Sequence, residues 1–507
     1  MANPLHDALY APLRGQDRVL MHLPDGATLS ADGFARMVAQ AAGALRALGL
    51  EPGDRVALQV AKSPQALALI SGAVAAGVVF LPLNTAYTPQ EVAYFITDAG
   101  ARLLVADPAR AEALAPVAKA AGAQLATLGA DGGGSVAQAM AAAPDTFAPQ
   151  DRAPDDLAAF LYTSGTTGRS KGAMLTQDNL LSNARVLAEA WRFTDADVLL
   201  HALPVFHTHG LFVATNTVLL TGGAMILHAG FDLDAVIAAL PRATAMMGVP
   251  TFYTRLLDDP RFTCDLVAHM RLFTSGSAPL LAETHAAFQA RTGHRILERY
   301  GMTETNMNTS NPYDGDRRPG TVGPPLPGVE VIITNPDTGA DLPQGETGMI
   351  EVRGPNVFKG YWNMPEKTAE ELRSNGFFIT GDLGRFDPDG SLQIVGRAKD
   401  LIISGGYNVY PKEVELVLDD MPGILESAVI GVPHPDFGEA VLAILVPTDS
   451  EPDIQEIAAS LADNLARYKQ PKAFMVMPEL PRNTMGKVQK AALRQQFAAY
   501  FSGQPVN

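Results

Sequence analysis

The chain of 507 residues contains a single cysteine, Cys264. One cysteine cannot form an internal disulfide or a thiolate metal cluster, so the sequence fits a reducing compartment and we expect a cytoplasmic protein. Positive charge is scarce as well, because 38 lysines and arginines face 54 aspartates and glutamates, for a formal net charge of −16. This balance argues against nucleic acid or anionic lipid as a partner, so a local basic site must meet any anionic ligand.

Long uninterrupted apolar runs are also missing. The N-terminus lacks the apolar core of a secretory signal. Residues 66–83 carry no charge, but Gly72, Gly77 and Pro82 interrupt them, and they follow the strand-like residues 54–60. A membrane-spanning helix needs roughly 20 apolar residues. We therefore predict a buried helix that leads into a buried strand, and no membrane partner.

Short apolar runs alternate with helical segments through most of the chain, which predicts an α/β fold with parallel sheets covered on both faces. From about Gly323 short strands and turns predict a β-rich unit, and after residues 396–400 a compact α+β pattern begins. We predict a large N-terminal domain of parallel-sheet α/β subdomains plus the β-rich unit, residues 1–396, and a small mobile α+β C-terminal domain, residues 397–507. The predicted strands include RLLVAD, DDLAAFLY, DVLLHALP, AMILHA, TAMMGVP and MRLFTSG, and the predicted helices include DNLLSNARVLAEAWRF and LAETHAAFQARTG.

The segment YTSGTTGRSKG, residues 162–172, directly follows the predicted strand DDLAAFLY. Its glycines leave backbone N–H groups open, and its hydroxyl groups and Lys171 add donors, so the segment can wrap a polyphosphate. It is not a Walker A loop, because Gly168 is followed by Arg-Ser-Lys rather than directly by Lys and Ser or Thr. The expected phosphate contacts are Thr163, Ser164, Gly165, Thr166, Thr167, Gly168 and Lys171.

This loop resembles the signature of the adenylate-forming superfamily, which includes acyl-CoA synthetases, firefly luciferases and the adenylation domains of peptide synthetases. Ser170 departs from it, because the family commonly has proline there, but the change leaves every donor in place. The resemblance continues in order along nearly the whole chain. The further matching segments are HALPVFHTHG (201–210), TSGSAPL (274–280), YGMTE (300–304), TGDLG (380–384), GRAKDLIISGGYNVYPKEVE (396–415) and PRNTMGK (481–487).

In this superfamily a carboxylate attacks the α-phosphate of ATP, and a thiol then attacks the acyl adenylate. The resemblance implies that Lys487 supplies charge at the reacting oxygens, where a pair of unit charges about 4 Å apart is worth ~4 kcal/mol at an effective dielectric of about 20. It also implies that Glu304, with Thr163, holds Mg²⁺ on the phosphates, and that Thr303 contacts the α-phosphate. Without the resemblance, Lys487 would be interpreted as an exposed cation.

The resemblance also assigns residues to the nucleoside, to CoA and to a hinge. Asp382 would bind the ribose hydroxyls together with Arg397, and Tyr300 would stack on adenine. Lys399 would be the hinge about which the small domain rotates between the half-reactions. As plain structure, Asp382 would be a turn residue and Lys399 a surface lysine. The expected sets are Gly276, Ser277, Ala278, Tyr300, Gly301, Thr303, Asp382 and Arg397 for the nucleotide, and Ser404, Gly405 and Gly406 for CoA.

Arg299 stands directly before Tyr300, where superfamily members that take fatty or aromatic acids often have glycine. A long cation there would shorten the acyl pocket and would be costly unless the substrate brings an anion. Arg255 borders the same expected pocket, and two arginines suit a dicarboxylate gripped by a guanidinium fork. The alternative is that Arg299 pairs with Glu298 or another acid. The expected acyl contacts are His207, Arg255, Ser277 and Arg299.

The sequence thus predicts a ligase that joins malonate to CoA with ATP and Mg²⁺, and the segments YDGDRRPGTVGPPLPG and PRNTMGKVQK resemble the malonyl-CoA synthetases. Methylmalonate stays open as a second substrate, as does another short acid. A carrier-protein-loading adenylation enzyme would share the first step but fail with free CoA. A luciferase-like oxygenase would need a bulky aromatic substrate, which a charged pocket suits poorly. A non-catalytic nucleotide sensor would lack Lys487. We expect a monomer or a homodimer.

Overall fold

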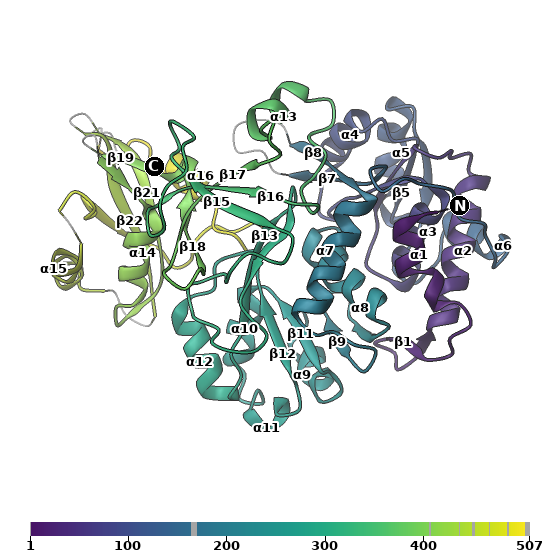
Figure 1. Ribbon diagram of the computed structural model, residues 1–507, viewed down its shortest axis with the longest axis horizontal. Coiled ribbons are helices and arrows are strands. Elements are labelled where there is room, and N and C mark those ends of the chain that lie inside the picture. The colour runs from purple at the N-terminus through teal and green to yellow at the C-terminus, as the bar shows by residue number, and fades with distance from the viewer. Residues whose placement is uncertain are drawn as a thin grey trace.

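The computed structural model describes residues 2–163, 170–404, 407–434, 437–448, 452–465, 467–483 and 486–501. Two largely parallel sheets form the larger part of the molecule, and two smaller sheets follow them along the chain (Figure 1). The predicted α/β class, with a large N-terminal part and a small C-terminal part, is confirmed. None of the helices in these ranges combines the length and apolarity that crossing a bilayer requires.

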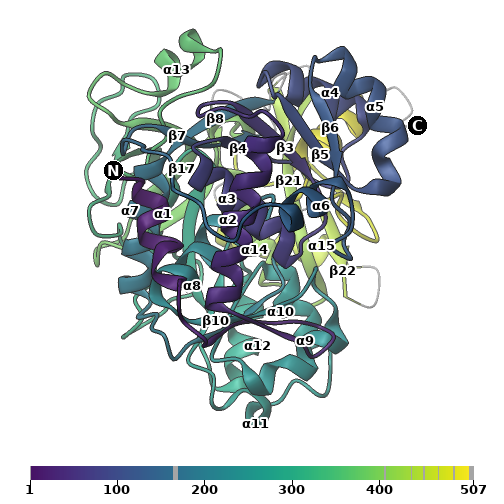
Figure 2. The same cartoon turned by 90° about the vertical axis from the view of Figure 1, so that its right-hand side faces the viewer.

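The first sheet has six strands in the order β6-β5-β3-β4-β7-β8, parallel except for the final pair. Residues 66–83 form the buried helix and strand that the sequence predicts, α3 and β4. At Gly72 the helices α2 and α3 touch, because a Cβ there would lie 2.6 Å from the Cβ of Ala41 (Figure 2). The elements are β3 (Arg55–Gln59), β4 (Val79–Pro82), β5 (Leu103–Ala106), β6 (Gln124–Thr127), β7 (Leu157–Thr163), β8 (Lys171–Thr176), α2 (Ala31–Ala47), α3 (Pro64–Ala76), α4 (Pro89–Asp98), α5 (Ala111–Ala120) and α6 (Ser135–Ala142).

The second sheet has eight strands in the order β14-β13-β12-β11-β9-β10-β1-β2, antiparallel only at its two ends. Its parallel strands end at one edge, so the segments that follow β9, β12 and β13 meet there. The strands are β1 (Val19–His22), β2 (Thr28–Ser30), β9 (Val198–His201), β10 (Ala224–Leu227), β11 (Ala245–Gly248), β12 (Leu272–Ser275), β13 (Leu297–Met302) and β14 (Asn306–Ser310). The helices are α1 (Pro4–Leu9), α7 (Gln177–Ala190), α8 (Asn216–Thr221), α9 (Leu233–Ala239), α10 (Pro250–Leu257), α11 (Cys264–Val267) and α12 (Ala282–Thr292).

The predicted β-rich unit is a four-stranded antiparallel sheet, and the C-terminal part has a five-stranded sheet of its own. Two clusters of buried apolar side chains, all from residues 402–497, cover this last sheet. Lys399 lies between the two sheets, in the short 3₁₀ turn Ala398–Asp400. The elements are β15 (Glu330–Thr334), β16 (Gly348–Arg353), α13 (Pro365–Glu371), β17 (Phe378–Phe386), β18 (Leu392–Arg397), β19 (Ile402–Ser404), β20 (Tyr407–Val409), α14 (Pro411–Asp419), β21 (Ile424–His434), β22 (Gly438–Pro447), α15 (Ile454–Asn464), β23 (Ala473–Val476) and α16 (Lys490–Gln496).

Candidate active site

Arg299 is buried in β13, with 4% of its surface exposed. Within the described ranges its Nε and Nη2 atoms have no hydrogen-bond partner, and no carboxylate lies within ion-pair distance of it. Burial lowers the pKa of the guanidinium to about 9, and the nearby phenol of Tyr253 opposes that shift only in part. A buried cation without a counter-charge is costly, so the site is built to receive an anion.

Glu298 does not supply that anion. Successive residues of a strand point to opposite faces of the sheet. Glu298 accordingly turns away from Arg299, and its Oε1 lies 3.6 Å from Nδ1 of His285. Burial raises the pKa of the Glu298 carboxyl. The alternative that Arg299 pairs with Glu298 is therefore wrong.

Two histidines face the same region. The backbone N–H of His209 donates to Nδ1 of His207 at 3.4 Å, and the Nδ1 atom of His209 lies 3.3 Å from the hydroxyl of Ser277. Burial and then the charges of Lys487 and Arg299 lower the pKa of His207 to about 3. Burial and then Arg299 also lower the pKa of His209. Both rings are neutral near pH 7, and Nδ1 of His207 is an acceptor, so its proton resides on Nε2.

The residues expected to bind the nucleoside come together around one carboxylate. The hydroxyl of Tyr300 donates to Oδ2 of Asp382 at 2.6 Å, and Nε of Arg397 lies 2.6 Å from Oδ1. Asp382 and Arg397 are direct partners in the β17–β18 register, which explains their contact. Burial and the Asp382 charge raise the pKa of Tyr300 well above its usual range. The three residues therefore form one polar cluster, in which Tyr300 and Asp382 are buried and Arg397 is half-exposed.

The turn after β12 lies beneath the Arg299 side chain. A Cβ at Gly276 would lie 2.3 Å from the guanidinium carbon, so a side chain there would displace the guanidinium. Ser277 has φ +71°, a conformation that non-glycine residues adopt rarely and mostly at functional sites. Gly301, like Gly276, has no space for a side chain, because a Cβ there would lie 1.8 Å from the carbonyl oxygen of Asn306. Ala278 follows Ser277 in this turn.

A second buried polar network surrounds Glu304, which is 5% exposed. The hydroxyl of Tyr361 lies 3.0 Å from Oε1 of Glu304 and 2.6 Å from Oε2 of Glu371. Lys171, the first residue of β8, lies 3.0 Å from the same Glu371 oxygen and 4.1 Å from the Tyr361 ring centre. Burial raises the pKa of Glu304. Thr303 precedes Glu304 in the turn between β13 and β14.

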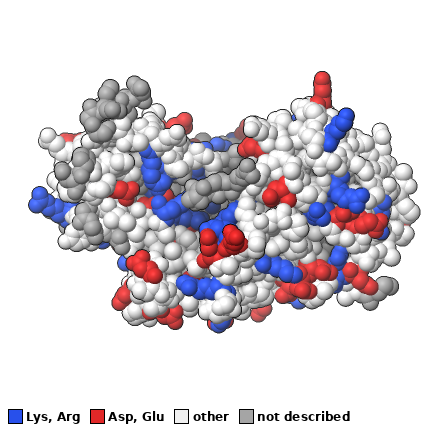
Figure 3. Space-filling model, turned by 90° about the horizontal axis from the view of Figure 1, so that it is seen from above, with Lys and Arg blue, Asp and Glu red and all other residues white. Residues whose placement is uncertain are grey.

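Lys487 belongs to the C-terminal part but reaches this site. Its side chain is solvent-exposed, yet the charges of Asp382, Glu304 and Arg397 act on it. Partial desolvation and then Arg397 lower its pKa, while the carboxylates of Asp382 and Glu304 oppose the shift. A Cβ on the preceding Gly486 would lie 3.6 Å from Thr251 of α10, so the two parts of the chain are in contact there. Figure 3 shows lysine and arginine side chains gathered between them.

Arg255 does not join Arg299. In helix α10 it is two residues from the buried Tyr253, so the two side chains point about 200° apart around the helix axis. Tyr253 faces Arg299, whereas Arg255 is exposed and lies 5.9 Å from the ring centre of Phe231. The structure therefore places Arg255 on the outer side of α10, because helical periodicity separates it from the pocket.

The remaining expected residues divide into two groups. Thr163 ends β7 opposite Lys171 in the β7–β8 register, and Ser404 is buried at the end of β19. The other expected contacts with phosphate and CoA lie outside the described residues: Ser164, Gly165, Thr166, Thr167, Gly168, Gly405 and Gly406.

Sequence reasoning missed several residues of the site. His209 stands in the segment HALPVFHTHG, and its position two residues after His207 was the available signal. Tyr361 and Glu371 carried no such signal, because their partners Glu304 and Lys171 lie far away in the sequence.

Comparison with known proteins identifies the family of the chain. Residues 11–362 match the family described as AMP-binding enzyme, and residues 413–487 match the AMP-binding enzyme C-terminal domain. A feruloyl-CoA synthase from an Amycolatopsis species is 39% identical over 478 residues, which cover 93% of this chain and 94% of the relative. A malonate–CoA ligase from Arabidopsis thaliana is 35% identical over 481 residues, which cover 87% of this chain and 78% of the relative.

Among solved structures, ATP-bound MatB from Rhodopseudomonas palustris is 55% identical and superposes with a TM-score of 0.97, covering 99% of this chain and 100% of that one. The apo form of MatB gives a TM-score of 0.87. The likeness covers both parts of the chain, and the superposition is closer with the ATP-bound form of MatB than with its apo form. The chain therefore belongs to the AMP-binding enzyme family and is an adenylate-forming CoA ligase.

Proposed function

We propose that the chain is a malonate–CoA ligase, which converts malonate, ATP and CoA into malonyl-CoA, AMP and diphosphate through malonyl-AMP. The observation that carries the proposal is the buried guanidinium of Arg299, whose Nε and Nη2 have no hydrogen-bond partner in the part of the chain that the structure describes. A distal carboxylate can accept both N–H groups as a fork, whereas an apolar acyl tail would leave the cation unpaired. The malonate–CoA ligase relative supports the same substrate. The feruloyl-CoA synthase relative is named for an aromatic acid, which suits this charged pocket less well.

In the first step a carboxylate oxygen of malonate attacks the α-phosphorus of ATP, and the bond to the bridging oxygen of diphosphate breaks. Two anions approach each other in this step, so positive charge at the reacting oxygens stabilises the transition state. Lys487 lies close to the candidate site and supplies this positive charge. Arg299 holds the other carboxylate, and Asp382 and Arg397 fix the ribose.

The surroundings of Glu304 fit a Mg²⁺ ion. Glu304 is a buried carboxylate that contacts the hydroxyl of Tyr361. Thr163, at the end of β7, is the second ligand that we propose. In the described part of the chain no three histidine, cysteine or acidic side chains cluster to hold a metal, and Mg²⁺ prefers few protein carboxylates together with phosphate oxygens. When bound, the ion would neutralise charge on the phosphates.

In the second step the sulfur of CoA attacks the acyl carbon of malonyl-AMP, AMP leaves with the electron pair, and the thiol proton is released. We propose that this step follows a rotation of the C-terminal domain, residues 397–507, about Lys399. Support comes from the turn that holds Lys399, which joins two separate sheets, and from the separate apolar clusters of the C-terminal part. Ser404 lies on β19, close after that turn.

The test is ATP-dependent consumption of the CoA thiol with malonate, methylmalonate, succinate, acetate, octanoate, benzoate and ferulate. We expect malonate to give the highest kcat/KM. A preference for octanoate, benzoate or ferulate would overturn the proposal. Adenylation of malonate, measured as pyrophosphate exchange, without consumption of free CoA would point to a carrier-protein substrate instead.

A further inference from the structure

Lys62 follows β3 of the six-stranded sheet, yet its ammonium binds the end of β9 in the eight-stranded sheet. Its Nζ lies 2.8 Å from Nδ1 of His201, 2.7 Å from the His201 carbonyl oxygen and 2.9 Å from the Leu203 carbonyl oxygen. Three acceptors require three N–H donors, so Lys62 is the charged ammonium even though burial lowers its pKa. Among the described residues no carboxylate lies within ion-pair distance of it. Lys62 therefore serves only these three acceptors.

The other ring nitrogen of His201 contacts the segment that follows β9. Its Nε2 lies 2.9 Å from the carbonyl oxygen of Gly210 and 3.0 Å from the hydroxyl of Thr215. The hydroxyl of Thr215 itself donates to the Gly210 carbonyl at 2.9 Å. A carbonyl can only accept, so Nε2 of His201 carries the proton and Nδ1 accepts from Lys62. The direction of every bond in the chain from Lys62 to Gly210 is thereby fixed.

Gly210 and Thr215 belong to a π-helix, His209–Thr215, a rare conformation that occurs mostly at functional sites. The first turn of this helix packs closely against the preceding segment, because a Cβ on Gly210 would lie 2.0 Å from the Pro204 carbonyl oxygen. Its first residue, His209, contacts Ser277 beneath the Arg299 side chain. The π-helix thus begins at the acyl side of the candidate site.

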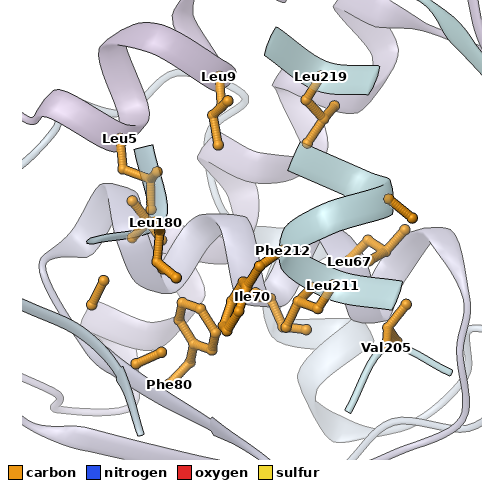
Figure 4. Packing of buried hydrophobic residues seen from close by; sticks show 14 of the residues in the cluster. Leu5, Leu9, Leu67, Ile70, Phe80, Leu180, Val205, Leu211, Phe212 and Leu219 are labelled. Carbon is orange, nitrogen blue, oxygen red and sulfur yellow. The ribbon is translucent and has the colours of Figure 1, made fainter. Parts of the chain in front are cut away.

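The other face of the π-helix is apolar. Leu211 and Phe212 point into a buried cluster with Leu67, Ile70 and Phe80 (Figure 4). The rings of Phe80 and Phe212 lie 6.1 Å apart. Apolar contacts are non-directional and do not by themselves fix the rotation of a helix. The hydrogen bonds from His201 are directional and therefore fix the rotation of the π-helix about its axis.

We propose that Lys62 is a positioning residue for the acyl pocket: through His201 it holds the π-helix that places His209 beside the acid. This inference rests on the proposed location of the acyl pocket, but not on the identity of the acid. On this proposal Lys62 acts through the position of the helix and not through contact with a substrate. The KM for the acid should therefore change, while the KM for ATP should not.

The test is Lys62→Met, which keeps the length of the side chain and removes its donors. The exposed Lys119→Met on α5 is the matched control. Kinetics are measured with the acid that the unsubstituted protein prefers, so a failure of the malonate assignment leaves this test intact. We expect kcat/KM for the acid to fall by roughly 100-fold through a higher KM, the size of effect that a displacement of about 1 Å can produce. The KM for ATP and the control variant should match the unsubstituted protein.

Thr215→Val is the second variant, since it removes only the hydroxyl that bonds Gly210 and His201 and keeps the shape of the side chain. We expect the same selective rise in the KM for the acid, smaller in size. If Lys62→Met does not fold, Thr215→Val decides the question alone. Normal kinetics in the folded variants, or an equal loss for acid and ATP with a lower Tm, would overturn the proposal.

Discussion

The guanidinium of Arg299 lies directly over Gly276. A Cβ added to Gly276 would come within 2.3 Å of its Cζ and 2.4 Å of its Nη1, closer than real Cβ contacts. The absence of a side chain at Gly276 therefore permits the buried position of Arg299. The two residues, on the turn after β12 and on β13, are packed directly against each other in the candidate site.

Gly276→Ala should consequently displace Arg299. Overpacking of this kind costs about 1 to 3 kcal/mol, so kcat/KM for malonate should fall roughly 5- to 150-fold. Gly230→Ala is the matched control, because a Cβ there meets nothing within 4 Å. Steady-state kinetics of both variants check the expectation, and unchanged malonate kinetics in Gly276→Ala would contradict it.

Arg299→Gly should change specificity as well as rate. Leaving the distal carboxylate poorly paired costs about 2 to 5 kcal/mol, so kcat/KM for malonate should fall roughly 30-fold to several thousandfold. The opened pocket should raise activity with butyrate and hexanoate relative to malonate. Arg255→Ala is the control, and its exposed position on α10 predicts nearly normal selectivity. A parallel loss for all acids with a lower Tm would assign Arg299 a structural role instead.

Lys487→Ala should separate the two half-reactions. Adenylation, measured by pyrophosphate exchange, should slow by roughly 100-fold or more because the developing charge loses its partner. Formation of the thioester from supplied malonyl-AMP should survive. Lys472→Ala, at an exposed position of the same domain, should leave both rates unchanged. Equal loss of both half-reactions in Lys487→Ala would indicate a general role in folding or binding.

Lys399→Pro should trap one orientation of the C-terminal domain, since proline fixes φ at the proposed hinge. Lys399 is exposed in the turn Ala398–Asp400, so the change should not disturb the core. Pyrophosphate exchange should persist while transfer to CoA collapses, and Lys399→Ala should retain both activities. Normal turnover in a folded Lys399→Pro variant would argue against a rotating domain.

His207 should make stability depend on pH. Its pKa is about 3 in the folded protein against an ordinary value of 6.5, so the unfolded chain binds the proton more readily. The contribution of His207 to the free energy of unfolding is thus complete above pH 6.5 and is lost as the pH falls toward 3. Urea unfolding at pH 7.5 and pH 5.5 should show a smaller loss in His207→Asn than in the unsubstituted protein. The exposed His269→Asn should leave the loss unchanged.

Much of the fold follows from local pattern. The predicted strand at residues 54–60 is β3 (Arg55–Gln59), and the predicted helix at residues 281–293 is α12 (Ala282–Thr292). These elements are predictable because buried parallel strands require continuous apolar runs. Helices instead require apolar residues that recur every three to four positions. Strand alternation could also have separated Glu298 from Arg299, and helical periodicity could have turned Arg255 away from Tyr253.

The network around Glu304 was beyond such reasoning. Tyr361 bonds Glu304 from 57 positions away, and Glu371 meets Lys171 across 200 positions. The contact of Lys62 with His201 spans 139 positions. No periodicity or spacing encodes such pairs, because they form only when separate sheets are packed together. The sequence therefore identified Arg299 as unusual but could not show that it lacks a partner.

The unpaired guanidinium of Arg299 also constrains how such a pocket arises and persists. Desolvating a cation without an anion destabilises the folded chain, so a lineage that acquires this arginine loses stability as it gains a new substrate. Exchange of the arginine for a small residue has the opposite effect, because it stabilises the fold and shifts specificity toward monocarboxylic acids. Drift alone therefore erodes dicarboxylate specificity, and continued selection is needed to maintain it.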